Sequence, residues 1–138
     1  MCPCELSLQL KNCQTETDRL ARCIADVGRR LGLDRKTVFA VTLAIEELFT
    51  NIVSYGFQDD AEHVIGIDIS TESQALTVRI EDEGRPFDPV LVDGPDVKCP
   101  LEDSKIGGLG IHLARKLMDE IAYERQDGKN IVILKKYI

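Results

Sequence analysis

Several features that would assign this 138-residue chain to a common class of protein are missing. No uninterrupted apolar run approaches the length that spans a bilayer and no signal peptide is recognisable, so we expect neither a membrane protein nor a secreted one. Seventeen basic residues stand against 24 acidic ones, and the net charge of −7 argues against a general binder of nucleic acid or of anionic membranes. A nucleotide is not excluded, because Mg²⁺ can neutralise phosphate locally.

The cysteines lack the spacing of a disulfide framework or of a metal site. Five is an odd number, and together with the irregular spacing it fits reduced thiols in a cytoplasm. Cys2-Pro3-Cys4 could hold a soft metal, but no second Cys/His pair with ligand spacing follows. We therefore interpret this end of the chain as a loose, reducible segment of a cytoplasmic protein.

What the chain contains is typical of one globular domain over residues 1–138. Its hydrophobic content is 43% and its charged content 30%, and no internal repeat or low-complexity segment divides it. A chain of this length buries about two-thirds of the surface that its unfolded form exposes. We expect one hydrophobic core.

Hydrophobic periodicity predicts strands and helices in the order β-α-α-β-β-(lid)-α-β-β. This order favours a two-layer α/β sandwich with one mixed, mostly antiparallel sheet and the helices on one face. Periodicity is lost between 83 and 105, so we predict a mobile lid over about 88–106. The strands are expected over 5–11, 65–69, 76–80, 121–125 and 130–137, and the helices between about 15 and 32, 34 and 56, and 107 and 120.

The first candidate motif lies on the second helix, whose apolar stripe runs from Val38 to Tyr55. Glu47 and Asn51 are four residues apart and so lie one turn apart on a shared face. An amide oxygen is a hard, neutral ligand for Mg²⁺, and a carboxylate can accept a proton from a nearby hydroxyl. The alternative is a solvated polar face beside a buried stripe.

The second motif follows a strand. Asp82 is placed where the chain leaves the sheet, and Gly84 permits a tight backbone or a close approach of a ligand. A buried carboxylate at this point could accept a hydrogen bond from the exocyclic amine of adenine. An acidic turn after a strand is the simpler alternative.

The third motif is a glycine cluster, 107–110, at the start of a helix, where free N–H groups and the positive end of the dipole attract anions. A Walker A motif would need a Lys-Ser/Thr pair, and the three-glycine dinucleotide fingerprint also fails. Phosphate binding here would depend on backbone amides and a metal ion. Glycines that only relieve crowding at a helix start are the alternative.

Taken in order, Glu-x-x-x-Asn on a helix, Asp-x-Gly-x-x-Phe-Asp after a strand and Gly-x-Gly-Ile at a helix start resemble the ATP-binding fold shared by gyrase, histidine kinases and mismatch-repair ATPases. The match is closest to the stand-alone bacterial anti-sigma-factor serine kinases, a family of small histidine-kinase-like ATPases. It extends from the first predicted strand to the closing hairpin. Each motif is modest alone, whereas the ordered set with a lid between the second and third is specific.

The resemblance implies ATP and Mg²⁺ as cofactors. Asn51 would coordinate the Mg²⁺, Glu47 would be the general base, and Asp82 would bind the adenine amine. Tyr55 is expected either at the ligand or as a core or lid-packing residue. The other residues expected at the nucleotide are Gly84, Phe87, Gly108, Leu109, Gly110 and Ile111.

The resemblance also implies partners. The substrate would be a serine or threonine of an anti-anti-sigma protein, and a homodimer of this chain would hold a sigma factor inactive. The expected lid is acidic, and Arg85 is the arginine nearest to it. We expect no direct contact with nucleic acid or membrane.

Two other functions compete with this one. A nucleotide-gated binding module would bind ATP and transfer nothing, although such a module has no need of Glu47 as a base. A sensor histidine kinase is disfavoured, because the chain has no helical-hairpin domain and its only histidines are His63 and His112.

Overall fold

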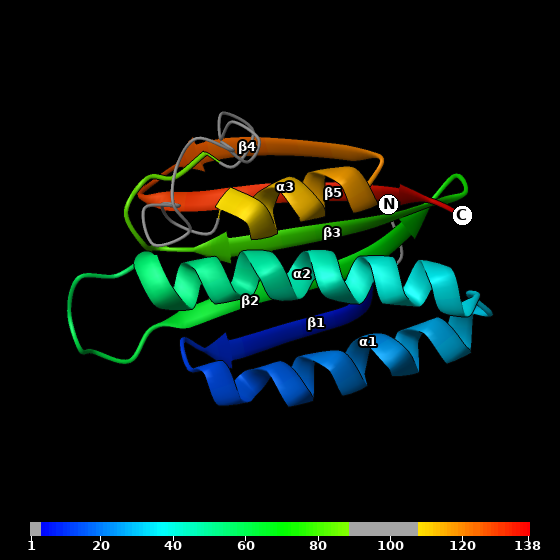
Figure 1. Cartoon of the computed structure of the whole chain (residues 1–138), viewed down its shortest axis with the longest axis horizontal. Helices are drawn as coiled ribbons and strands as arrows, with labels where there is room; N and C mark the ends of the chain where they lie inside the picture. The colour runs from blue at the N-terminus through cyan, green and yellow to red at the C-terminus, as the bar shows by residue number, and fades with distance from the viewer. Residues whose placement is uncertain (1–3, 89–107) are drawn as a thin grey trace.

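The computed structural model describes residues 4–88 and 108–138, which form one sheet and one layer of helices (Figure 1). Most of the expected lid, together with Cys2, Pro3 and Gly107, lies outside the described residues.

The sheet has five strands, and every pairing that the structure describes is antiparallel. The predicted sandwich is confirmed, with a more uniform sheet than the mixed, mostly antiparallel one expected. Alternating residues of the central strands are fully buried, because one face of the sheet packs on the helices. The strands lie in the order β1 (Cys4–Lys11), β2 (Val64–Glu72), β3 (Ala75–Asp82), β5 (Lys129–Tyr137) and β4 (Glu120–Gln126).

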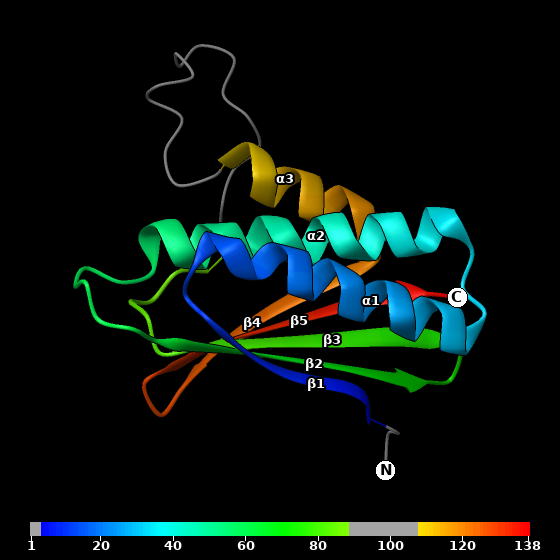
Figure 2. The ribbon, with the colours of Figure 1, turned by 90° about the horizontal axis from the view of Figure 1, so that it is seen from below.

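Three helices cover one face of the sheet, and the opposite face has none among the described residues (Figure 2). They are α1 (Thr17–Leu31), preceded by a short 3-10 turn, η1 (Gln14–Glu16), then α2 (Arg35–Tyr55) and α3 (Gly108–Leu117). Helix α2 lies between the other two (Figure 1). It therefore contributes most of the helical side of the core.

The ends of the helices follow local sequence signals. Helix α1 ends at Gly32, whose φ of 69° is left-handed and favours glycine. Helix α2 begins after Asp34, whose side chain accepts a hydrogen bond from the Thr37 amide at 2.8 Å. The third helix is shorter than predicted, because the Asp119 amide already donates to Lys135 O and Glu120 begins β4.

Helix α2 carries both the core and the candidate site. Its buried residues run from Ala40 to Asn51, and Phe49 is fully buried. Tyr55, the last residue of the helix, lies beyond this stretch and is 41% exposed, so its predicted place on the buried stripe is wrong. The buried residues of α2 are Ala40, Val41, Ala44, Ile45, Leu48, Phe49 and Asn51.

By length and composition alone, α2 could also cross a membrane. It is the one such helix in the described ranges, and its charged residues Arg35, Lys36, Glu46 and Glu47 interrupt its apolar sequence. Here the helix packs on a sheet and contributes to a closed core, as the core helix of a globular domain does.

Two hairpins with two-residue turns set the register of the sheet. Ser73 and Gln74 join β2 to β3, and Asp127 and Gly128 join β4 to β5; all four have positive φ, from 47° to 79°. Strands β3 and β5 pair so that the end of one lies opposite the start of the other. This pairing positions one wall of the site.

Candidate active site

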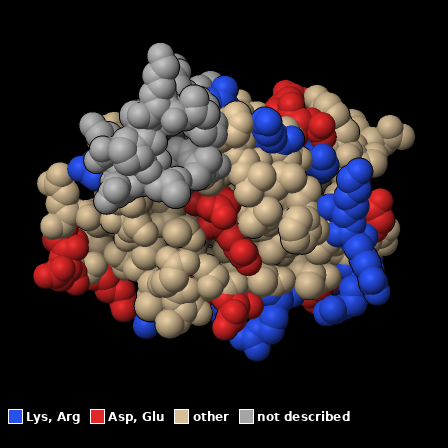
Figure 3. Space-filling view, in the orientation of Figure 1, with Lys and Arg blue, Asp and Glu red and all other residues tan. Residues whose placement is uncertain are grey.

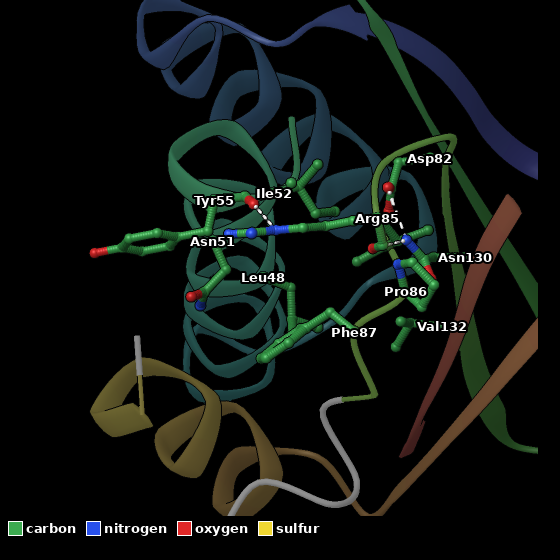
Figure 4. Close-up of a pocket in the computed structure, with 12 residues that line it drawn as sticks. Leu48, Asn51, Ile52, Tyr55, Asp82, Arg85, Pro86, Phe87, Asn130 and Val132 are labelled. Carbon is green, nitrogen blue, oxygen red and sulfur yellow. Dashed lines mark hydrogen bonds between the residues drawn. The ribbon is translucent and has the colours of Figure 1, made fainter. Parts of the chain in front are cut away.

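A cavity of about 240 Å³ lies between the last turns of α2, the turn after β3 and the start of β5 (Figure 4). Four predicted residues from two of the three motifs line it: Asn51 and Tyr55 from the helix, and Asp82 and Phe87 from the segment after the strand. In Figure 4 the Phe87 ring lies beside Leu48, whereas the Tyr55 ring points away from Asp82. The apolar part of the wall consists of Leu48, Ile52, Ile80, Pro86, Phe87 and Val132.

Asn51 has a buried oxygen with no hydrogen-bond partner among the described residues. Its side chain is 6% exposed, and its Nδ2 donates to Glu47 O at 3.0 Å. Its Oδ1 is the one buried side-chain polar atom without a partner in the described part of the chain. Because such a group costs about 1–3 kcal/mol, the atom is suited to a ligand that satisfies it, and a hard divalent cation accepts amide oxygen.

Glu47 lies against the first turn of α3. A Cβ atom built on Gly110 would overlap the Glu47 carboxylate, so any larger residue at 110 would displace the end of that side chain. The first and third motifs therefore meet. Gly108 and Leu109 open the helix, while the side chain of Ile111 is fully buried, so only its backbone could contact a ligand.

Asp82 is a buried carboxylate, 4% exposed, at the end of β3. Its Oδ1 accepts hydrogen bonds from the Gly84 amide at 2.8 Å and from Asn130 Nδ2 at 3.1 Å. Burial raises the pKa of Asp82, and these hydrogen bonds and the charge of Arg125 oppose that rise. The group is thus a buried acceptor facing a largely apolar cavity.

The turn after β3 is fixed to the end of α2. The Arg85 amide donates to Gly56 O at 2.9 Å, and Arg85 Nε donates to Tyr55 O at 2.8 Å. At Gly84 a Cβ would come within 2.6 Å of Gly56 O, so the close approach predicted for this glycine is to the protein's own backbone. The second motif is thereby held beside the first.

Positive charge is scarce around the cavity, where Arg85 is the one cationic residue among the described lining. In Figure 3, Lys and Arg side chains gather where α1 ends and α2 begins, whereas Asp and Glu side chains lie both near the middle of this face and at its edges. No group of three His, Cys, Asp or Glu suited to a metal occurs among the described residues. A Mg²⁺ ion that Asn51 helps to bind would take its other ligands from phosphate and water, as Mg²⁺ commonly does.

The contribution of the β4–β5 hairpin to the cavity was not predicted from the sequence. Asn130 lines the cavity, and Arg125 donates to Gly84 O at 2.7 Å. A buried asparagine at the start of an otherwise apolar strand was a usable signal for Asn130. Nothing in the local sequence marks Arg125, because its role depends on which strand neighbours which.

A cavity between a helix and a sheet, with an acid at a strand end and a glycine-led helix beside it, defines an ATP-binding domain of the histidine kinase type. The family model of the histidine kinase-like ATPase domain matches residues 11–136. The chain therefore belongs to this family, as its motifs predicted.

Characterised relatives narrow the class. The chain is 31% identical over 96 residues to the serine/threonine-protein kinase BtrW of Bordetella bronchiseptica, covering 70% of this chain and 68% of that protein. It is 28% identical over 116 residues to the serine-protein kinase RsbW of Listeria monocytogenes, covering 81% and 74%. The predicted relation to the serine kinases of this fold is confirmed.

A solved structure shares the fold. The crystal structure of the RsbU and RsbW domains of Rv1364c from Mycobacterium tuberculosis has a TM-score of 0.63 at 15% identity. The match covers 96% of this chain and 32% of that one. At this identity the likeness concerns the fold alone.

Proposed function

We propose that this chain is an ATP-dependent protein serine/threonine kinase that acts as an anti-sigma factor. It phosphorylates a serine or threonine of an anti-anti-sigma partner and holds a sigma factor inactive. The observation that carries this proposal is the meeting of the three motifs: Glu47 against Gly110, and Asn51 and Asp82 on one cavity.

Each of these side chains has a role suited to its surroundings. Asp82 would accept a hydrogen bond from the amino group of adenine, while the apolar wall would pack against the base. The amides at the start of α3, including those of Gly108, Leu109, Gly110 and Ile111, are available to phosphate oxygens. Asn51 Oδ1 would supply one ligand of Mg²⁺, and its lack of a hydrogen-bond partner among the described residues supports this role.

Glu47 is one helical turn from Asn51 and is therefore close to the expected position of the phosphates. Its carboxylate accepts the proton of the substrate hydroxyl and orients the oxygen toward the phosphorus. When bound, Mg²⁺ supplies charge neutralisation on the phosphates. Phosphoryl transfer depends mainly on such positioning and charge stabilisation.

The partners and the location belong to the same proposal. Relatives named serine-protein kinases support a protein substrate with a hydroxyl acceptor. We propose that the chain acts in the cytoplasm as a homodimer. Sedimentation of the purified chain at micromolar concentration tests the dimer.

Radiolabelled ATP tests the activity. The purified chain, Mg²⁺ and [γ-³²P]ATP are incubated with candidate anti-anti-sigma proteins encoded nearby, and we expect label on a serine or threonine of one of them. Parallel pull-downs with sigma factors test sequestration. ATP binding without transfer to any candidate would favour a nucleotide-gated binding module, and absence of ATP binding would refute both functions.

A further inference from the structure

Asn130 lies at the centre of a buried hydrogen-bond network beside the cavity. It is 4% exposed and stands opposite Asp82 in the pairing of β5 with β3. Its Nδ2 donates to Asp82 Oδ1 at 3.1 Å and to Arg85 O at 2.9 Å, with a longer contact to Gly84 O at 3.4 Å. The amide thus connects the acid to the turn that follows it (Figure 4).

The orientation of the Asn130 side-chain amide is fixed by a hydrogen bond from the neighbouring strand, β4. Tyr123, on β4, donates its hydroxyl hydrogen to Asn130 Oδ1 at 2.5 Å. The reverse orientation would turn the amide oxygen toward the Asp82 carboxylate and two backbone carbonyls, all of which are acceptors. Tyr123 and these acceptors therefore select the same orientation of Asn130.

The network leaves one oxygen of Asp82 for a ligand. Oδ1 is occupied by the Gly84 amide and Asn130, whereas Oδ2 has no hydrogen-bond partner among the residues that the structure describes. Burial raises the pKa of Asp82; the hydrogen bonds from Asn130 and Gly84 and the charge of Arg125 lower it, and Glu81 raises it. Donated hydrogen bonds favour the ionised acid, which can only accept.

We propose that Asn130 is a positioning residue that makes this cavity select adenine over guanine nucleotides, with Tyr123 holding Asn130 in the required orientation. The inference rests on the proposed nucleotide-binding function. Adenine offers an amino donor where guanine has a carbonyl acceptor. An ionised Asp82 with a fixed Oδ2 accepts a hydrogen bond from the adenine amino group and repels the guanine carbonyl oxygen. A protonated Asp82 carboxyl could instead donate a hydrogen bond to the guanine carbonyl.

The test measures dissociation constants for ATP and GTP, with Mg²⁺, at several pH values. The variants are Asn130→Leu and Tyr123→Phe, and the control is Ile52→Val, which alters the cavity wall from α2 rather than from the β4–β5 pair. We expect the preference for ATP over GTP to fall about tenfold in Asn130→Leu and about threefold in Tyr123→Phe. The pH below which ATP affinity declines should move upward in both.

A purely structural role for Asn130 predicts a different result. Binding of ATP and of GTP would then weaken equally and the pH profile would stay in place, as expected for Ile52→Val. This outcome would overturn the proposal. If Asn130→Leu does not fold, Tyr123→Phe decides, since it removes one half-buried hydroxyl. Failure of the wild-type chain to bind ATP would instead refute the proposed function.

Discussion

The carboxylate of Glu47 occupies the space in which residue 110 would carry a side chain. The atoms nearest to a Cβ built on Gly110 all belong to Glu47, so the glycine and the acid are matched. The absence of a side chain at Gly110 therefore makes room for the Glu47 carboxylate, independently of any contribution of the Gly110 backbone to phosphate binding.

Gly110→Ala tests this match through a double-mutant cycle. Alanine is favoured over glycine inside a helix by about 1 kcal/mol, and the overlap with Glu47 opposes that gain. We expect Gly110→Ala to change the free energy of unfolding little in the wild type and to raise it by about 1 kcal/mol in the Glu47→Ala background. Urea unfolding measures both; equal effects in the two backgrounds would contradict the contact.

Glu47→Gln should separate nucleotide binding from phosphoryl transfer. The amide keeps the shape of the side chain and cannot accept the proton, so we expect unchanged ATP affinity and a transfer rate lower by about 10²–10⁴. Label transfer and calorimetry measure the two quantities. Glu46→Gln, one residue away on another face of α2, is the matched control and should transfer at the wild-type rate.

Asn51→Leu removes the buried amide oxygen that lacks a hydrogen-bond partner in the described ranges. We expect the variant to unfold at the same or a higher urea concentration, because no unsatisfied carbonyl is left. ATP affinity should lose its dependence on Mg²⁺, with Ser54→Ala as a control on the exposed side of the helix. Mg²⁺-dependent affinity equal to that of the wild type would count against Asn51 as a metal ligand.

Asp82→Asn should stabilise the protein and weaken ATP binding. The pKa of Asp82 is raised chiefly by burial, so its charged form costs folding free energy at pH values above the folded pKa. The variant should therefore melt higher at neutral pH, and its advantage should shrink as the pH falls through the folded pKa toward 3.8, the ordinary value. Loss of the charged acceptor should weaken ATP binding about tenfold. A melting difference independent of pH would contradict the assigned cause.

Much of the fold can be predicted from local sequence patterns. Alternation identifies the central strands, and Asp34 marks the start of α2 because its carboxylate caps the first turn. Such signals act within a few residues, so they predict the order of the elements and the types of turn. Tyr55 shows their limit, since periodicity continues to the end of a helix after the partner surface has ended.

The site was predictable where its members share an element. Glu47 and Asn51 lie one turn apart by helix geometry, and Asp82 and Gly84 share a turn. The contact of Asp82 with Asn130 was beyond this reasoning, because 48 residues separate them in the chain and the contact requires β5 to insert between β3 and β4. Only the strand order reveals it.

That strand order makes the tight Asp127–Gly128 turn a determinant of the nucleotide pocket, although neither residue contacts the cavity. Successive residues of a strand face opposite sides of the sheet, so a single inserted or deleted residue that shifted β5 by one position would turn Asn130 to the far side. We therefore expect nucleotide binding to be as sensitive to the number of residues in this turn as it is to substitutions of the residues that line the pocket.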